Sequence, residues 1–203
     1  MNYLATDTSG KYLTVIANGK KKSIRYLADC ALSHSVVLMD EIEKALKEAE
    51  IEISDVDVFA CSVGAGSFTG IRIGVSTIKA FAYAFHKKTL GVTSFETLAY
   101  SITDRVKKLA IISARHGNYY ACGFDENGKV AMSPRFMSAE EIKSLKGEYT
   151  VIADEDADDI GALIADVKIG FERAVEAKLD EAEFDAETLV PLYVKKSQAE
   201  EEA

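Results

Sequence analysis

An apolar, β-branched run that leads through a glycine-rich loop into a helical pattern is the feature that most constrains this chain. The run is VDVFACSV at residues 56–63, the loop and first helical turn read GAGSFTGIRIG at residues 64–74, and helical periodicity extends from Ile71 to His86. A continuous apolar run of this kind is typical of a fully buried strand. Glycines at its end let the backbone take positive φ or approach another group closely. The pattern predicts a strand-loop-helix unit of an α/β fold.

The glycine loop has two interpretations, a cradle for phosphate or a turn that lets backbones pack tightly. Its spacing, G-x-G-x-x-x-G-x-x-x-G, matches neither the dinucleotide fingerprint nor the P-loop, and Lys79 lies about two turns into the helix, too far to act as a P-loop lysine. The spacing favours the structural interpretation, with the Ser67 hydroxyl available as a helix cap. The residues assigned to this structural loop are Gly64, Gly66, Ser67, Thr69 and Gly70.

The helix after the loop is apolar over most of its circumference. At 100° per residue, one apolar stripe consists of Ile71, Val75, Ile78, Ala82 and Phe85. A second stripe lies beside it and consists of Ile73, Thr77, Ala80, Phe81 and Ala84, with Gly70 and Gly74. A helix of this kind must be covered on more than one side. The second stripe therefore either packs inside its own domain or meets a second chain, and the pattern alone leaves both open.

A second amphipathic helix is predicted from His34 to Ala49, with Ser33 as its N-cap. Val36 and Val37 fall off its apolar stripe. Beside a helix rich in small residues, two exposed valines can form part of an apolar patch.

Composition limits the classes of function. The chain has 203 residues, nearly half of them apolar, so it can bury the core of one large or two small domains. Its net charge of −9 argues against unaided binding of nucleic acid, because phosphate contacts require a basic surface. Cys30, Cys61 and Cys122 lack C-x-x-C spacing and indicate reduced thiols. Without an N-terminal signal pattern or an apolar run of about 18 residues, we expect a soluble, cytoplasmic protein that does not bind membranes.

The order of predicted elements repeats along the chain. Strands at 3–8, 12–17, 23–27, 56–63 and 90–92, with helices at 34–49 and 71–86, give the order β-β-β-α-β-α-β. After a helix at 94–105, the order β-β-β-α-β recurs with strands at 109–113, 119–124, 130–135 and 150–153 and a helix at 139–146, where Ser138 and Glu141 form a capping box. The repeat predicts two related α/β lobes, one over residues 1–102 and a reduced, acidic one over residues 103–203.

Candidates for chemistry are few. The three histidines, at positions 34, 86 and 116, include no pair at metal-ligand spacing, and we expect each to be a surface or capping residue. Asp7, at the end of the first strand, is the best lone candidate for a catalytic or magnesium-linked carboxylate, although an Asx turn with Thr8 and Ser9 is the favoured interpretation. Arg115 lies in a turn and could bind an anion. The acidic runs at 154–159 and 180–187 are interpreted as solvated segments.

Six motifs occur in order along most of the chain: LATDTS, HS before the first helix, VGAGSFTGIRIGVSTIKAFAYA, GVTSFETLA, SARHGNYYACGF and PLYVKK. Together they resemble the TsaB (YeaZ) family, bacterial partner proteins in the synthesis of N6-threonylcarbamoyladenosine on tRNA. The GSFTGIRIG segment is quite specific to that family. The chain departs from the family pattern at Ala65, where proline is usual, and near Lys195, where arginine is usual.

The resemblance implies the actin/sugar-kinase/Hsp70-like fold, with two ribonuclease-H-like lobes of which the second is reduced. It also implies no independent catalysis, no metal and no cofactor of its own. In that family, the related subunit TsaD carries the metal-binding histidine pair and transfers the threonylcarbamoyl group to adenosine 37 of tRNAs that read A-starting codons. TsaB binds TsaD through the first two helices of the N-terminal lobe, and the ATPase TsaE joins that pair.

Carried over to this chain, the resemblance assigns a partner interface to the helices at 34–49 and 71–86. Its residues are Val36, Val37, Ile73, Gly74, Thr77, Ala80, Phe81 and Ala84. In isolation we expect a homodimer, and we expect tRNA to be reached only through the complex. Whether a nucleotide sits at the boundary with TsaD stays open. The alternative function is a small-molecule kinase or ATPase of the same fold, which would require Asp7, the glycine loop and an adenosine-binding loop to converge.

Overall fold

The computed structural model describes residues 1–114, 116–157 and 159–194 of the chain. Its contacts divide the chain into two compact units, and each unit is described by itself. The first unit combines Met1–Ser94 with Glu172–Pro191, and the second combines Phe95–Phe171 with residues 192–194. The predicted boundary between two lobes, after residue 102, stays a prediction. The contact-based division differs from it mainly because segment 172–191 returns to the first unit.

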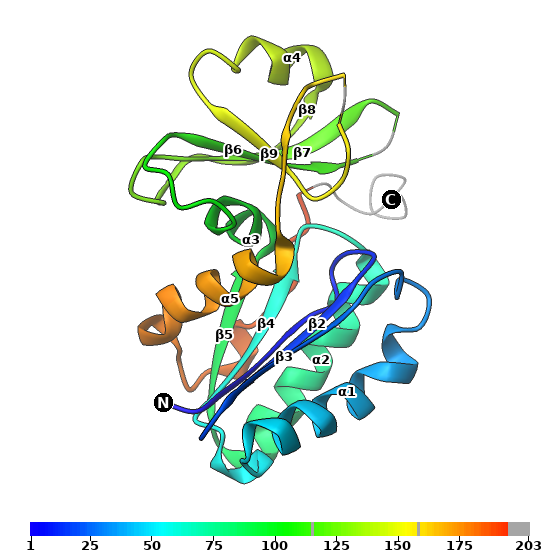
Figure 1. The fold of residues 1–203 in the computed structure, drawn as a ribbon, viewed down its shortest axis with the longest axis vertical. Helices are drawn as coiled ribbons and strands as arrows, with labels where there is room; N and C mark the ends of the chain where they lie inside the picture. Colours follow the sequence, from blue (N-terminus) through cyan, green and yellow to red (C-terminus); the bar gives the residue numbers. More distant parts are fainter. Residues whose placement is uncertain (115, 158, 195–203) are drawn as a thin grey trace. The chain divides into compact units, whose positions relative to one another are not determined.

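The first unit contains a five-stranded mixed sheet in the order β3-β2-β1-β4-β5 (Figure 1). Its strands are β1 (Tyr3–Asp7), β2 (Leu13–Asn18), β3 (Lys22–Leu27), β4 (Val58–Gly64) and β5 (Lys88–Thr93). The first three strands form an antiparallel meander, whereas β4 pairs in parallel with both β1 and β5. Because β1 and β4 are buried along their whole length, they are apolar runs, as expected for central strands.

Two helices cover one face of this sheet, α1 (His34–Ala49) and α2 (Phe68–Phe85), joined through the short 3₁₀ helix η1 (Ile53–Asp55) and β4 (Figure 1). Glycines of α2 face Thr8, which follows β1. On the opposite face, the Tyr3 hydroxyl donates a 3.1 Å hydrogen bond to Glu176 of α5 (Val167–Lys178). The sheet is therefore covered on both faces, as its apolar strands require.

The two helices begin differently from one another. Helix α2 begins three residues earlier than predicted, at Phe68, and the Ser67 side chain caps it by accepting a 3.2 Å hydrogen bond from the Gly70 amide, as predicted. Helix α1 has the predicted bounds, but the prediction that the Ser33 side chain caps it is wrong. The Ser33 hydroxyl instead lies 3.3 Å from the carbonyl of Cys30, to which it donates.

The segment after α5 completes the first unit and was not predicted. It contains two 3₁₀ turns, η2 (Leu179–Glu181) and η3 (Ala186–Thr188). Backbone hydrogen bonds of 2.8 and 3.1 Å join Thr89 of β5 to Glu183 in both directions. This pairing covers part of the outer edge of β5, which would otherwise expose unpaired amide and carbonyl groups.

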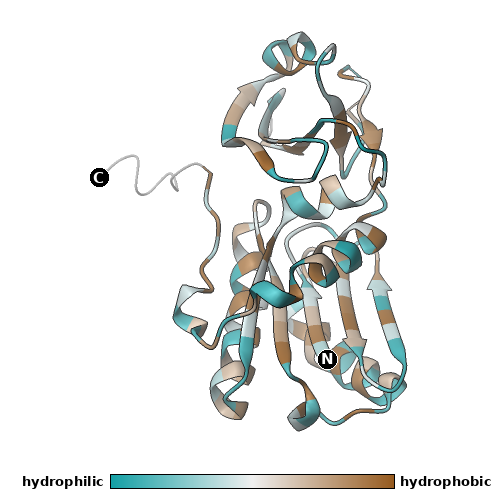
Figure 2. Cartoon of the chain, turned by 90° about the vertical axis from the view of Figure 1, so that its left-hand side faces the viewer, coloured by the Kyte–Doolittle hydropathy of each residue, from teal (hydrophilic) through white to brown (hydrophobic). Residues whose placement is uncertain are grey.

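The second unit contains a sheet in the order β10-β9-β6-β7-β8. Its elements are α3 (Ser94–Tyr100, beginning at the boundary between the units), β6 (Lys108–Ser113), β7 (Asn118–Phe124), β8 (Val130–Ser138), α4 (Ala139–Ser144), β9 (Thr150–Ala153) and β10 (Leu163–Ile164). Strands β6, β7 and β8 repeat the antiparallel meander, and β9 pairs in parallel with β6 and β10. The predicted capping box is present, because Ser138 and Glu141 each bond the other's backbone amide. In both units, hydrophobic stretches occur along the strands (Figure 2).

The two sheets share one topology, since β6–β10 pair as β1–β5 do. The predicted repeat of β-β-β-α-β order is confirmed by this correspondence. The helix predicted at 94–105 is shorter and ends at Tyr100. Strand β10 and helix α5 were missed by the sequence analysis. The core of the second unit includes Leu109, Ile111, Ala121, Ile142 and Val151.

Candidate functional site

The predicted partner interface lies on the outer side of α1 and α2. Of its α2 residues, Ala80 and Ala84 are exposed, whereas Ile73, Thr77 and Phe81 are half-buried. Four residues of the first stripe, Ile71, Val75, Ile78 and Ala82, are each at most 5% exposed, whereas Phe85 at the end of the helix is half-buried. Helix α2 is thus covered on one side by its own unit, and its second stripe is partly exposed to solvent.

Two residues of the predicted interface also have roles inside the unit. Gly74 is buried, and a Cβ there would stand 2.6 Å from the Thr8 hydroxyl, so this glycine allows α2 to approach the segment that follows β1. The Phe81 ring stacks on Phe59 of β4 with ring centroids 5.6 Å apart. The exposed part of the second stripe is therefore centred on Ala80 and Ala84, whereas Gly74 faces the interior of the unit.

Large apolar side chains are exposed on helix α1 and just before it. Val36 is 74% exposed and Met39 is 52% exposed, while Val37 is half-buried. Leu32, which precedes the helix, is fully exposed. Single exposed apolar residues are ordinary, but a cluster on neighbouring helices is typical of a protein-protein contact.

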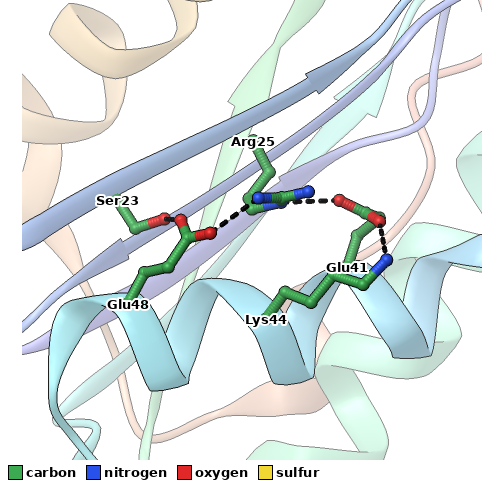
Figure 3. A network of polar contacts seen from close by, with 5 residues as sticks. All are labelled: Ser23, Arg25, Glu41, Lys44 and Glu48. Carbon is green, nitrogen blue, oxygen red and sulfur yellow. Dashed lines mark hydrogen bonds and ion pairs between the residues drawn. The ribbon is translucent and has the colours of Figure 1, made fainter.

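A polar network fixes α1 against the edge strand β3 (Figure 3). Arg25 of β3 donates from Nε to Glu41 at 2.7 Å and from Nη1 to Glu48 at 2.6 Å, and Lys44 donates to the second Glu41 oxygen at 2.7 Å. The Glu48 carboxylate also accepts a bond from Ser23. The bond from Lys44, together with that from Arg25, lowers the pKa of Glu41 below its ordinary value despite the opposing effect of burial. The network therefore links α1 to the edge strand β3 at two positions, Glu41 and Glu48.

The glycine loop packs against the turn after β1. Gly66 has a φ of +151°, and a Cβ there would overlap the carbonyl oxygen of Ser9, while the Ser67 amide donates a 2.7 Å bond to that same oxygen. A Cβ on Gly70 would overlap the carbonyl oxygen of Thr8, whose hydroxyl donates a 2.7 Å bond to the Gly70 carbonyl. Gly64 has a φ of +100°, and Thr69 is exposed. These contacts support the interpretation that the loop glycines allow close backbone packing. That role of the loop stays a proposal.

Asp7 lies in a buried cluster of hydroxyl groups. Its Oδ1 accepts bonds from the Ser9 amide at 2.9 Å and the Ser9 hydroxyl at 2.7 Å, which is the Asx-turn geometry. The Ser94 hydroxyl donates to Ser9 at 2.9 Å and lies 3.2 Å from the Ser62 hydroxyl. The second Asp7 oxygen, Oδ2, is buried without a hydrogen-bond partner among the described residues. Burial raises the pKa of Asp7, although the Ser9 bonds oppose that shift.

The thiols are poor candidates for nucleophilic chemistry. Cys30, Cys61 and Cys122 are all buried as free thiols. Burial is the largest cause that raises the pKa of Cys61 well above its ordinary range and that of Cys122 to about 12. A thiol with a raised pKa carries little of the reactive thiolate at neutral pH.

The other sequence candidates are scattered. His34, expected at the surface or as a cap, is buried, and its Nε2 donates to the Tyr12 carbonyl at 2.9 Å. His86 takes the left-handed conformation at the end of α2, and His116 takes it in the β6–β7 turn. Arg115, Lys195 and Asp158 of the acidic run lie outside the described residues. Within the described ranges, no three His, Cys, Asp or Glu side chains are grouped to hold a metal. In that part of the chain, no helix has the length and apolar character needed to cross a bilayer.

Comparison with known proteins identifies the family. The family model described as "TsaD: tRNA N6-adenosine threonylcarbamoyltransferase" matches residues 28–173. The protein named tRNA threonylcarbamoyladenosine biosynthesis protein TsaB in Escherichia coli (strain K12) is 25% identical over 164 residues, which cover 75% of this chain and 71% of the relative. Its namesake in Buchnera aphidicola subsp. Schizaphis graminum (strain Sg) is 29% identical over 120 residues, 58% of this chain and 57% of the relative. This chain belongs to the TsaB/YeaZ family.

Solved structures of the TsaB/YeaZ family have the same fold. YeaZ from Pseudomonas aeruginosa superposes with a TM-score of 0.74 at 21% identity, covering 95% of this chain and 99% of YeaZ. A Pseudomonas aeruginosa protein described as uncharacterized, with similarity to peptidase YEAZ, superposes with a TM-score of 0.78, also at 21% identity, covering 96% of this chain and 99% of that one. The expected two-lobe, ribonuclease-H-like fold is confirmed. The matches to the two curated TsaB relatives span 57% and 71% of their lengths.

Sequence reasoning missed several features of this TsaB/YeaZ family member. The hydroxyl cluster around Asp7 includes Ser62 of β4 and Ser94, which follows β5. Because these residues are far apart in the sequence, no local motif predicts the cluster. The ion network on α1 could have been found in part, because Glu41, Lys44 and Glu48 are spaced three and four residues apart. The partner strand residue Arg25 is apparent only once β3 is placed beside α1.

Proposed function

We propose that this chain is a non-catalytic subunit that binds TsaD for threonylcarbamoylation of adenosine 37 in tRNAs that read A-starting codons. The observation that carries the proposal is the outer face of α1 and α2. There, exposed Val36 and Met39 lie on one helix and exposed Ala80 and Ala84 on the other. Small residues on α2 allow a partner helix to approach closely, and the large apolar side chains of α1 provide area to bury.

The interior of the first unit supports a subunit without catalysis of its own. Asp7 is held by Ser9 in a buried turn, and the glycine loop presses against the Thr8 and Ser9 backbone. An active-site nucleophile needs an adjacent base and an accessible position. The buried Cys61 thiol of this unit, with its raised pKa, does not offer this, and neither does the buried Cys122 thiol of the second unit.

The family resemblance and the charge of the chain guide the rest of the proposal. TsaE joins through the TsaD-bound pair, and tRNA is contacted through the complex, because a net charge of −9 opposes a direct contact with RNA. We propose a homodimer through the same face when TsaD is absent, a cytoplasmic location, and no cofactor of its own. A nucleotide at the boundary with TsaD is compatible with this role.

Reconstitution tests the proposal. The purified chain should co-elute with TsaD in size-exclusion chromatography, and tRNA modification by TsaD and TsaE should require it. The chain alone should neither modify tRNA nor hydrolyse ATP at a useful rate. Failure to associate with TsaD, or full tRNA modification without the chain, would contradict the proposal.

A small-molecule kinase or ATPase is the alternative, and the unpartnered Asp7 Oδ2 is the observation that favours it. A buried carboxylate oxygen without a partner is costly, so it is sometimes retained for chemistry. ATP turnover by the purified chain that disappears in Asp7→Ala would support this alternative. Turnover that is equal in the two proteins would indicate a contaminant.

A further inference from the structure

The outer edge of β5 is crossed by the segment that follows α5, and both belong to the first unit (Figure 1). We call residues 180–189 of this segment the edge strap. Strand β5 is the last strand of its sheet, so its outer edge has no neighbouring strand in the first unit. Glu183 of the edge strap forms an antiparallel bridge with Thr89 there, through backbone hydrogen bonds of 2.8 and 3.1 Å. The edge strap therefore takes the place of a sixth strand at one position of β5.

A second backbone group of this edge is bonded by a lysine. The backbone of successive strand residues points alternately to the two sides, so Gly91, two residues after Thr89, also points away from β4. Lys178, the last residue of α5, donates from Nζ to the Gly91 carbonyl at 3.3 Å. A Cβ on Gly91 would stand 3.2 Å from Cδ1 of Leu189, which is buried. The glycine thus leaves room for the edge strap to lie close to β5.

Two further lysines contact the edge strap from β5 and α2. The Lys88 ammonium group lies 5.5 Å from the centroid of the Phe184 ring, within the range of a cation–π contact. Lys79 of α2 donates to the Glu187 carbonyl at 3.5 Å. These contacts attach the edge strap to the helix behind the strand as well as to the strand itself.

The edge strap is also strongly acidic, whereas the strand that it covers is not. Five of its residues are exposed carboxylates: Asp180, Glu181, Glu183, Asp185 and Glu187. Strand β5, with the sequence KTLGVT, carries none. Proteins protect an edge strand from pairing with another chain either by covering it or by placing charged side chains along it. Both kinds of protection are present at β5.

We propose that the edge strap prevents two copies of this chain from pairing through their β5 edges. An edge strand is complementary to its own copy, because two such edges can pair antiparallel about a twofold axis and join two sheets into one. The edge strap occupies the Thr89 backbone groups that this pairing requires. Its carboxylates would also bring like charges together across the contact, which opposes association.

Sedimentation velocity of the full chain tests the proposal, in proteins that also carry Ala80→Glu to oppose association through the α1–α2 face. The test variant is Glu183→Pro, which removes the amide that donates to the Thr89 carbonyl. The matched control is Glu183→Ala, which removes the same carboxylate but keeps the amide. We expect Glu183→Pro to form a dimer with a dissociation constant at least about 10-fold lower than that of the control. Hydrogen exchange should show the Thr89 and Gly91 amides of that variant more protected at high protein concentration than at low.

A second variant decides the question if circular dichroism shows that Glu183→Pro does not fold. Lys178→Met keeps the aliphatic stem and removes the bond to the Gly91 carbonyl, so it should raise self-association in the same way. Its control is Lys129→Met, at an exposed position of the second unit. Folded test variants that associate no more than their controls would overturn the proposal. Dimers that form without added protection of the two β5 amides would overturn it as well, because the contact would then lie elsewhere.

Discussion

Thr8 and Gly70 approach each other closely, through one hydrogen bond and one backbone contact. The Thr8 hydroxyl donates a 2.7 Å hydrogen bond to the Gly70 carbonyl, and the Thr8 carbonyl oxygen occupies the place where a Cβ on residue 70 would stand. This close approach joins the first turn of α2 to the end of β1. It explains why a glycine is needed inside a helix, where alanine would ordinarily be favoured by about 1 kcal/mol.

Gly70→Ala should therefore destabilise the protein by about 1–3 kcal/mol, because the added methyl group meets backbone atoms that cannot move independently. Gly66→Ala should have a similar effect, since its φ of +151° is also unfavourable for alanine. Urea unfolding followed by circular dichroism measures both changes. Gly147→Ala is the control, because nothing lies within 4 Å of a Cβ there. Wild-type stability in both loop variants would show that the loop glycines are not structural.

The Arg25–Glu41 pair should contribute measurably to stability. Arg25→Met keeps the aliphatic stem but leaves the buried Glu41 with Lys44 as its remaining cationic partner, so we expect a loss of about 1–3 kcal/mol at pH 7. The pKa of Glu41 is lowered in the folded protein, so the stability from its ionised form is present above its unfolded pKa and is lost as pH falls through the folded value. The difference between variant and wild-type chains should therefore shrink in acid. A difference that grows in acid would contradict this account.

The exposed pair of Lys107 and Glu148 provides the comparison for that experiment. Its side chains are 38% and 53% exposed, and its 2.9 Å contact belongs to a class worth roughly 0–1 kcal/mol. Lys107→Met should cost less than Arg25→Met in the same urea titration. Equal losses would mean that the burial of Glu41 adds nothing.

Asp7→Asn should become more favourable relative to wild type as pH rises. The folded pKa of Asp7 is raised by burial, so its protonated form stabilises the fold below the unfolded pKa, and that contribution is lost as pH rises through the folded value. Asparagine stays neutral and can still accept both Ser9 bonds through its side-chain oxygen. Urea unfolding of both proteins from pH 4 to pH 8 tests this. A stability difference that is constant with pH, or that moves toward the wild-type chain, would contradict it.

The sequence predicted the topology of this protein well because its signals are local. The helix at 34–49 was placed with its observed bounds, and the capping box was found because Ser138 and Glu141 are three residues apart. Both patterns report periodicity or capping within a few residues. The start of α2 was placed three residues late, at Ile71, because the prediction followed the apolar periodicity and glycine is unfavourable within a helix, even though Ser67 had been identified as a possible cap.

Features that depend on distant segments were not predictable from one sequence. Helix α5 is joined to the sheet through ion pairs of Glu172 and Glu176 with Lys22, which is about 150 residues away in the sequence, as the bond separations of 150 and 154 show. Gly74 was assigned to the partner face, but its closest neighbour is Thr8, which lies far away in the sequence. A groove at the ends of α1 and α2 likewise joins residues of the β2–β3 hairpin, both helices and η1.

The most direct test of the central claim is the affinity of Ala80→Glu for TsaD, measured by isothermal titration calorimetry alongside Ala177→Glu. Both alanines are exposed on helices, but Ala177 lies on α5, away from the α1–α2 face. A charge left unpaired in a desolvated contact should cost several kcal/mol of binding. We predict that Ala80→Glu keeps its helical circular dichroism spectrum and loses TsaD binding, whereas Ala177→Glu binds like the wild-type chain. Wild-type affinity in a folded Ala80→Glu protein would contradict the proposed interface.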